Sequence, residues 1–208
     1  MHKLAALFLA LSTSCSHCTA RIKHGADLEL APVVHKAVVQ AEEASTTSDA
    51  ELVGEVDGES LGAILNVIGN APKGGTIRLF VSSPGGDGIA TLRFLELVRQ
   101  AKEEKGIRLE CRSGMLVASA AAIIFEAACD ARQGDEGTIW LFHGVASQSQ
   151  GKVGNVEDDA ALMRALDHSV AVLVAPHLHM TVEQYLAWIE GRDRWLTTEQ
   201  LRKMGGCD

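Results

Sequence analysis

The sequence has no excess of basic residues and no dense basic cluster. Its 208 residues include 19 lysines and arginines against 27 aspartates and glutamates, so the formal net charge is −8 at pH 7. A negatively charged chain repels the phosphates of nucleic acids and of anionic lipid headgroups. We therefore expect neither nucleic acid nor an anionic membrane surface as a partner.

The apolar run near the amino terminus, Leu4 to Leu11, is too short to cross a bilayer, which takes roughly 20 residues. It follows Met1-His2-Lys3 and precedes small residues before Cys15, the order typical of a signal peptide. We expect a secretory or lipoprotein signal over residues 1–18 and export to the periplasm. If the small residues before Cys15 form a bacterial lipoprotein cleavage site, Cys15 is the lipidated residue. A buried apolar helix of the mature fold is a further alternative.

Metal-binding cysteine patterns are also missing. Among the five cysteines, Cys15 and Cys18 have two-residue spacing, but no second pair or histidine cluster completes a zinc site. We expect no metal and no cofactor. Cys111 and Cys129 can pair in an oxidising compartment, where a disulfide would brace the segment between them. Two buried thiols are the alternative.

The composition suits one compact domain. The chain is 47% apolar and 22% charged, which is enough for a core in a soluble protein, and it shows no repeat period. Residues 19–50 are expected to be a variable amino-terminal segment that ends in a Ser- and Thr-rich linker over 44–49. Residues 51–208 are expected to fold as the domain.

Short apolar strands alternate with amphipathic helices along this domain, which predicts an α/β fold with a parallel sheet flanked by helices. Strands are expected over residues 51–56, 76–81, 107–111 and 138–142. Helices are expected over residues 60–68, 87–105, 119–128, 157–174, 182–189 and 198–204. Reactive groups in such folds gather at the carboxyl ends of the strands.

Three motifs fall at these strand ends. Ser83-Pro84-Gly85-Gly86 stops one strand, and its glycines allow a close backbone approach and amides aimed at an oxyanion. Ser119 stands among small residues at the start of an apolar helix, and His143 ends a later strand. Each feature alone is common in turns, helix caps or cores. Together they predict a serine hydrolase site, in which a base activates the hydroxyl.

These motifs and the ending Trp195 to Asp208 resemble the Clp protease proteolytic subunits and their exported relatives, over residues 51–208. The resemblance implies a ClpP/crotonase-like spiral of ββα units. It implies Ser119 as nucleophile, His143 as general base, and the amides of Gly86 and Ala120 as the oxyanion hole.

The third catalytic residue is less clear from the sequence. Asp193 lies nearest the family's acidic position, and a salt bridge to its neighbours Arg192 and Arg194 is the alternative. Asp167 is a second candidate for the acid, although its place in the middle of a helix favours a solvated side chain.

The resemblance predicts an exported serine peptidase that cleaves short or unfolded polypeptides and self-associates into a homo-oligomer. An ATPase partner is not expected, because ATP is absent outside the cytoplasm. Two alternatives remain. One is a catalytically inactive scaffold of the same fold. The other is a crotonase-like acyl-thioester enzyme, which would need an adenine pocket that the sequence does not reveal.

Overall fold

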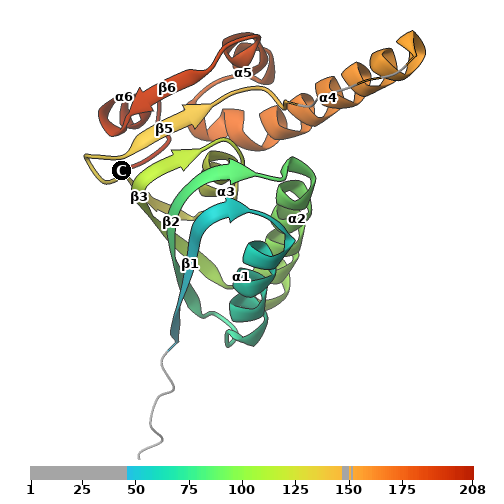
Figure 1. Cartoon of the computed structure of the whole chain (residues 1–208). Helices are drawn as coiled ribbons and strands as arrows, with labels where there is room; N and C mark the ends of the chain where they lie inside the picture. The colour runs from blue at the N-terminus through green and yellow to red at the C-terminus, as the bar shows by residue number, and fades with distance from the viewer. Residues whose placement is uncertain (1–45, 147–149, 151) are drawn as a thin grey trace, which may run out of the picture. The chain divides into compact units, whose positions relative to one another are not determined.

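A computed structural model describes residues 46–146, 150 and 152–208 (Figure 1). The expected signal, Cys15 and nearly all of residues 19–50 lie outside the described residues. The strands are β1 (Thr47–Val56), β2 (Thr76–Gly86), β3 (Arg108–Ala118), β4 (Ala131–Gln133), β5 (Ile139–Phe142) and β6 (Arg194–Thr197). The helices are α1 (Gly58–Asn70), α2 (Gly88–Lys105), α3 (Ala120–Ala128), α4 (Val153–Val174), η1 (Ala175–Leu178), α5 (Val182–Ile189) and α6 (Thr198–Lys203).

The strands form one sheet in the order β1-β2-β3-β5-β6, and β4 also pairs with β3 (Figure 1). All pairings are parallel except that of β5 with β6, which is antiparallel. The expected mixed α/β fold with a mostly parallel, helix-flanked sheet is therefore confirmed. The sequence did not reveal β4 and β6, because runs of three and four residues are too short to show strand periodicity.

Four boundaries differ clearly from the expected ones. β2 continues to Gly86 and β3 to Ala118. Ser83-Pro84-Gly85-Gly86 therefore forms the end of β2 and does not stop the strand before it, contrary to expectation. β1 begins at Thr47, because residues 47–49 continue the parallel ladder opposite residues 76–78, so it includes three residues of the tract expected as a linker. α4 begins at Val153, four residues before the expected start at Glu157. Its amino-terminal half is exposed and extends away from the sheet (Figure 1).

Side-chain caps set several helix starts at or within two residues of the expected positions. The Asp57 carboxylate accepts the backbone N–H groups of Glu59 and Ser60 at α1. Thr181 and Thr197 cap α5 and α6 through their hydroxyl oxygens. Such caps satisfy amides that have no partner inside the helix.

Helix α3 forms the centre of the core. Eight of its residues are buried, and it contacts β2, β3, α2 and α4. Phe125 of α3 packs edge-to-face on Trp140 of β5, with ring centroids 4.9 Å apart. This packing fixes the helix, and with it the residue that precedes its first turn. None of the helices within the described ranges is long and apolar enough to span a membrane.

Candidate active site

Ser119 occupies the turn between the end of β3 and the start of α3. Its backbone has φ 54° and ψ −125°, and in the described part of the chain only His179 is another non-glycine residue with positive φ. A residue held in such a sparsely populated conformation costs about 1–3 kcal/mol and persists where the surrounding structure enforces it. Strained strand-to-helix turns of this kind present the nucleophilic serine in α/β-hydrolase folds.

Backbone hydrogen bonds hold this turn while leaving the hydroxyl unused by the helix. The Ser119 N–H donates to the carbonyl oxygen of Leu141 in β5 at 2.8 Å, and its own carbonyl accepts from Ile123 at 3.1 Å. The Ser119 side chain makes no capping hydrogen bond to α3. The helix-cap explanation for this serine therefore does not apply.

Gly85, the first glycine of the pair at the end of β2, lies directly against this serine, whereas Gly86 lies against the backbone of Val56 in β1. A Cβ at Gly85 would lie 2.6 Å from Ser119 Cβ and 3.1 Å from the backbone nitrogen of Ala120. A Cβ at Gly86 would lie 2.2 Å from the carbonyl oxygen of Val56. Only glycine tolerates these contacts, so the predicted close backbone approach is confirmed. Gly85, Ser119 and Ala120 thus come together at the carboxyl edge of the sheet.

His143 directly follows β5, the strand that pairs with the end of β3. The ladder pairs Ala118 with Leu141, so Ser119 and His143 both lie just beyond this pair. The ring Nδ1 is 2.6 Å from the carbonyl oxygen of Gly144. Because a carbonyl can only accept, Nδ1 carries a proton, and in the neutral ring Nε2 is then an acceptor, as a general base requires. No hydrogen bond joins Ser119 and His143 in the described residues.

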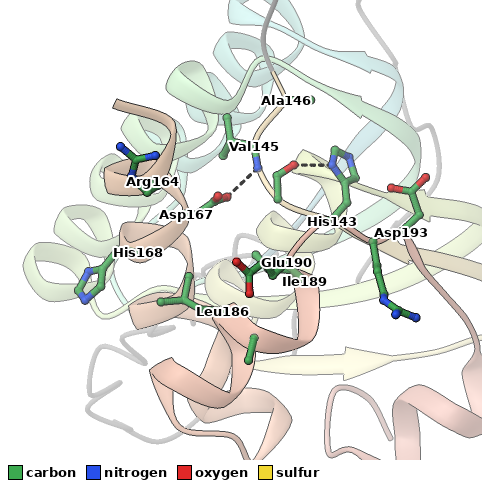
Figure 2. A pocket seen from close by; sticks show the side chains of 14 residues that line it. His143, Val145, Ala146, Arg164, Asp167, His168, Leu186, Ile189, Glu190 and Asp193 are labelled. Atoms are coloured by element: carbon green, nitrogen blue, oxygen red, sulfur yellow. Dashed lines mark hydrogen bonds between the residues drawn. The ribbon is translucent and has the colours of Figure 1, made fainter. Parts of the chain in front are cut away.

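Asp193 lies close to His143 because of the β5–β6 register. Phe142 pairs with Arg194, so the next positions outward along the two antiparallel strands are His143 and Asp193. Both residues line a cavity of about 640 Å³ (Figure 2). Asp193 is exposed, and the described residues include neither a hydrogen bond from it to His143 nor an ion pair with Arg192 or Arg194.

Asp167 lines the same cavity from α4 and is half-buried, not solvated as its mid-helix position suggested. Its Oδ1 accepts the backbone N–H of Val145 at 2.6 Å (Figure 2). The sequence did not indicate this contact, because 22 residues separate the two partners. No periodicity or spacing motif reports such a pairing.

A disulfide joins Cys111 of β3 to Cys129, which follows α3. The bridged segment contains Ser119. Of the two alternatives left open by the sequence, pairing and buried thiols, the structure shows pairing. The remaining described cysteine, Cys207, is a buried free thiol.

The ionisable side chain of α3, Glu126, lies outside this site. The Glu126 side chain is fully buried, and neither carboxylate oxygen has a hydrogen-bond partner. Arg132 Nε is 3.6 Å away, too far for a hydrogen bond, so burial outweighs the ion pair and raises the pKa of Glu126 to about 8. The sequence contained one signal for it, a single carboxylate within an otherwise apolar helix.

A family model described as Clp protease matches residues 51–208. No curated protein matches the chain.

Proposed function

Because the chain belongs to the Clp protease family, we propose that it is a serine peptidase that hydrolyses peptide bonds in short or unfolded polypeptides. The observation that supports this proposal is the backbone of Ser119, held at positive φ against Gly85. A structural serine at a helix start has no need of such a conformation. Strain of this kind is typical of residues that the fold positions for chemistry.

In the proposed reaction, Ser119 Oγ attacks the substrate carbonyl while Nε2 of His143 takes its proton. The amides of Gly86 and Ala120 donate to the oxyanion that forms. His143 then protonates the leaving amine, and water hydrolyses the acyl-enzyme by the reverse sequence of proton transfers. Catalytic hydrogen bonds are often long without substrate, so His143 is expected to approach Ser119 when a peptide binds.

Asp193 is the proposed acid of the site. The β5–β6 register supports this role, since it brings Asp193 to the position beside His143. A carboxylate there stabilises the imidazolium that forms when the ring takes the serine proton. The exposed setting of Asp193 leaves it free to turn toward the ring.

Active-site labelling tests the proposal. A fluorophosphonate probe is expected to label the wild-type protein, and Ser119→Ala is expected to abolish labelling. Ser169→Ala is the matched control, because its hydroxyl lies on α4 and bonds only within that helix, to Ala165. Thermal unfolding verifies that each variant is folded. Absence of labelling in folded wild-type protein would contradict the peptidase.

A catalytically inactive scaffold is the second candidate. It is favoured by one observation: within the described residues, no hydrogen bonds connect Ser119, His143 and Asp193 to one another. The labelling experiment separates the two, since a scaffold would bind peptides without reacting with the probe.

We also propose that the protein is exported and self-associates. The leader-like sequence before Cys15 supports export, and so does the Cys111–Cys129 disulfide, because disulfides persist in oxidising compartments. No ATPase partner is then expected. Fractionation of a bacterial host expressing the full chain tests this: the protein is expected outside the cytoplasm. If Cys15 is lipidated, Cys15→Ser releases the protein from the membrane fraction, whereas Cys18→Ser does not.

A further inference from the structure

One peptide group connects His143 to a carboxylate on another element. The carbonyl oxygen of Gly144 accepts from Nδ1 of His143 at 2.6 Å, and the N–H of Val145 donates to Oδ1 of Asp167 at 2.6 Å. This oxygen and this N–H belong to the same Gly144–Val145 peptide unit (Figure 2). The order of groups is therefore carboxylate, peptide, imidazole.

Both ends of this arrangement are short hydrogen bonds, and one is charge-assisted. A carboxylate that accepts a peptide N–H polarises the unit and makes its carbonyl oxygen a better acceptor. The Nδ1–H of His143 is then held more firmly.

The local sequence allows the carboxylate to come this close. A Cβ at Gly144 would lie 3.3 and 3.4 Å from the two oxygens of Asp167, which is tighter than ordinary side-chain contacts. Asp167 itself is held by α4, whose carboxyl-terminal part packs on α3, α5 and η1. The helix thus fixes the carboxylate, and the carboxylate fixes the segment that follows His143.

We propose that Asp167 is a positioning residue for His143, acting through the Gly144–Val145 peptide. It holds the proton on Nδ1 and the ring in a fixed orientation, so that Nε2 is free to take the proton of Ser119. This inference rests on the proposed peptidase function. Asp167 does not touch the reacting atoms, and its role differs from that of Asp193, which approaches the ring from β6.

The decisive test is the titration of His143 measured by NMR in a Ser119→Ala background, which does not require catalysis. Asp167→Asn keeps an oxygen that can accept from Val145 but removes the charge. In this variant we expect the 15N chemical shifts of the His143 ring, followed through the titration, to show that the proton is held less firmly on Nδ1. Loss of the signal in His143→Gln assigns the resonance.

Asp158→Asn is the matched control, because Asp158 is an exposed residue of the same helix. It makes the same change of charge without a contact to the Gly144–Val145 peptide, and we expect it to leave the titration unchanged. The other charged groups on the cavity wall are present in every variant: Arg164, His168, Glu190, Arg192 and Asp193. The difference between the two aspartate variants therefore isolates Asp167.

Kinetics with Ser119 intact provide the second readout. In Asp167→Asn we expect kcat for peptide cleavage to fall about tenfold or more with little change in KM. Asp158→Asn is expected to match the wild type. An identical His143 titration in the two variants would overturn the inference, even in an active peptidase. Absence of cleavage by the wild-type protein would overturn the proposed function. The NMR comparison would still show whether Asp167 acts on the His143 ring, because it does not depend on catalysis.

Discussion

At the scale of single residues, the site depends on a backbone position that only glycine can occupy. Gly85 has φ 98°, and a Cβ there would overlap both Ser119 Cβ and the carbonyl oxygen of Ala118, at 2.6 and 2.7 Å. Both contacts are with the serine turn itself. Any side chain at this position must push the nucleophile away or leave the left-handed region.

We therefore expect Gly85→Ala to lower the free energy of unfolding by about 2 kcal/mol or more and to abolish probe labelling of Ser119. Urea unfolding and fluorophosphonate labelling measure the two effects. Gly88→Ala is the matched control, because a Cβ there meets nothing within 4 Å at the start of α2. It is expected to keep full labelling. Labelling of Gly85→Ala at the wild-type rate would show that the close contact is not required.

Glu126 makes stability depend on pH. Its pKa in the folded protein is about 8, above the value of 4.5 for an unperturbed glutamate. The folded protein therefore keeps a proton that the unfolded chain loses between these pH values. Stability falls as pH rises through this window, because the unfolded chain gains free energy by releasing the proton to water, whereas the folded protein retains it: a buried charge would be only partly compensated by Arg132.

Glu126→Gln replaces the protonated acid with a neutral side chain of the same shape. We expect the loss of unfolding free energy between pH 5 and pH 8 to shrink by about 2 kcal/mol or more in this variant. Urea unfolding at both pH values measures it. Glu104→Gln, at an exposed position of α2, is the control and should behave like the wild type. Equal pH dependence in all three proteins would contradict a buried, proton-retaining Glu126.

At the scale of elements, the disulfide joins the two elements that hold the nucleophile. Cys111 lies in β3 and Cys129 directly follows α3, with a sequence separation of 18. The bridge closes a loop that contains the end of β3, the Ser119 turn and all of α3. In the unfolded chain this closure restricts the conformations of that loop.

We expect the Cys111→Ser, Cys129→Ser double variant to lose about 3 kcal/mol of unfolding free energy, as is typical for loops of this size. Urea unfolding with and without dithiothreitol measures it. The reductant should lower the stability of the wild-type protein by a similar amount and have no effect on the double variant. A double variant as stable as the wild type would show that packing alone holds the segment.

At the scale of the whole molecule, one face of the sheet exposes apolar side chains. The register pairs Leu116 with Ile139 and Leu141 with Trp195, so these four side chains lie on the same face of β3, β5 and β6. Ile139 and Trp195 are 53% and 54% exposed. Exposed apolar patches of this kind are typical of interfaces, which supports self-association through this face.

We expect the protein to sediment as a homo-oligomer, and Trp195→Glu to shift it toward the monomer. Val53→Glu is the control, because Val53 is an equally exposed apolar residue, at 59%, on β1. Analytical ultracentrifugation over a range of concentrations measures the masses. A monomeric wild-type protein would contradict the proposed assembly. If only the Val53→Glu control sediments at a lower mass, the interface lies at β1 and not at this face of β3, β5 and β6.

Much of the fold could be predicted because its elements carry local signals. Alternating residues 51–56, the apolar run 76–81 and the helix caps at Asp57 and Thr181 are short-range patterns, and the structure contains them. β4 and β6 were missed because their pairing depends on partners that are distant in sequence. Tertiary contacts, not local pattern, make those residues strands.

In the proposed site, too, some features have local sequence signals and others depend on contacts between distant segments. Ser119, His143 and the glycine pair are visible in the sequence, because small residues, strand ends and turn motifs are local features. The positive φ of Ser119, the register that brings Asp193 beside His143, and the contact of Asp167 with the Gly144–Val145 peptide are not. Each of these depends on two segments meeting in space.

The sequence by itself determined the α/β class, the main helices and strands and the family to which residues 51–208 belong. Those properties depend on periodicity and on the choice of residue at single positions. Only the tertiary structure decided that Cys111 and Cys129 pair and that the His143 ring donates to Gly144 beside a carboxylate from α4. The reason is geometric: hydrogen bonds and disulfides need atoms within a few ångströms, and chain folding alone sets those distances.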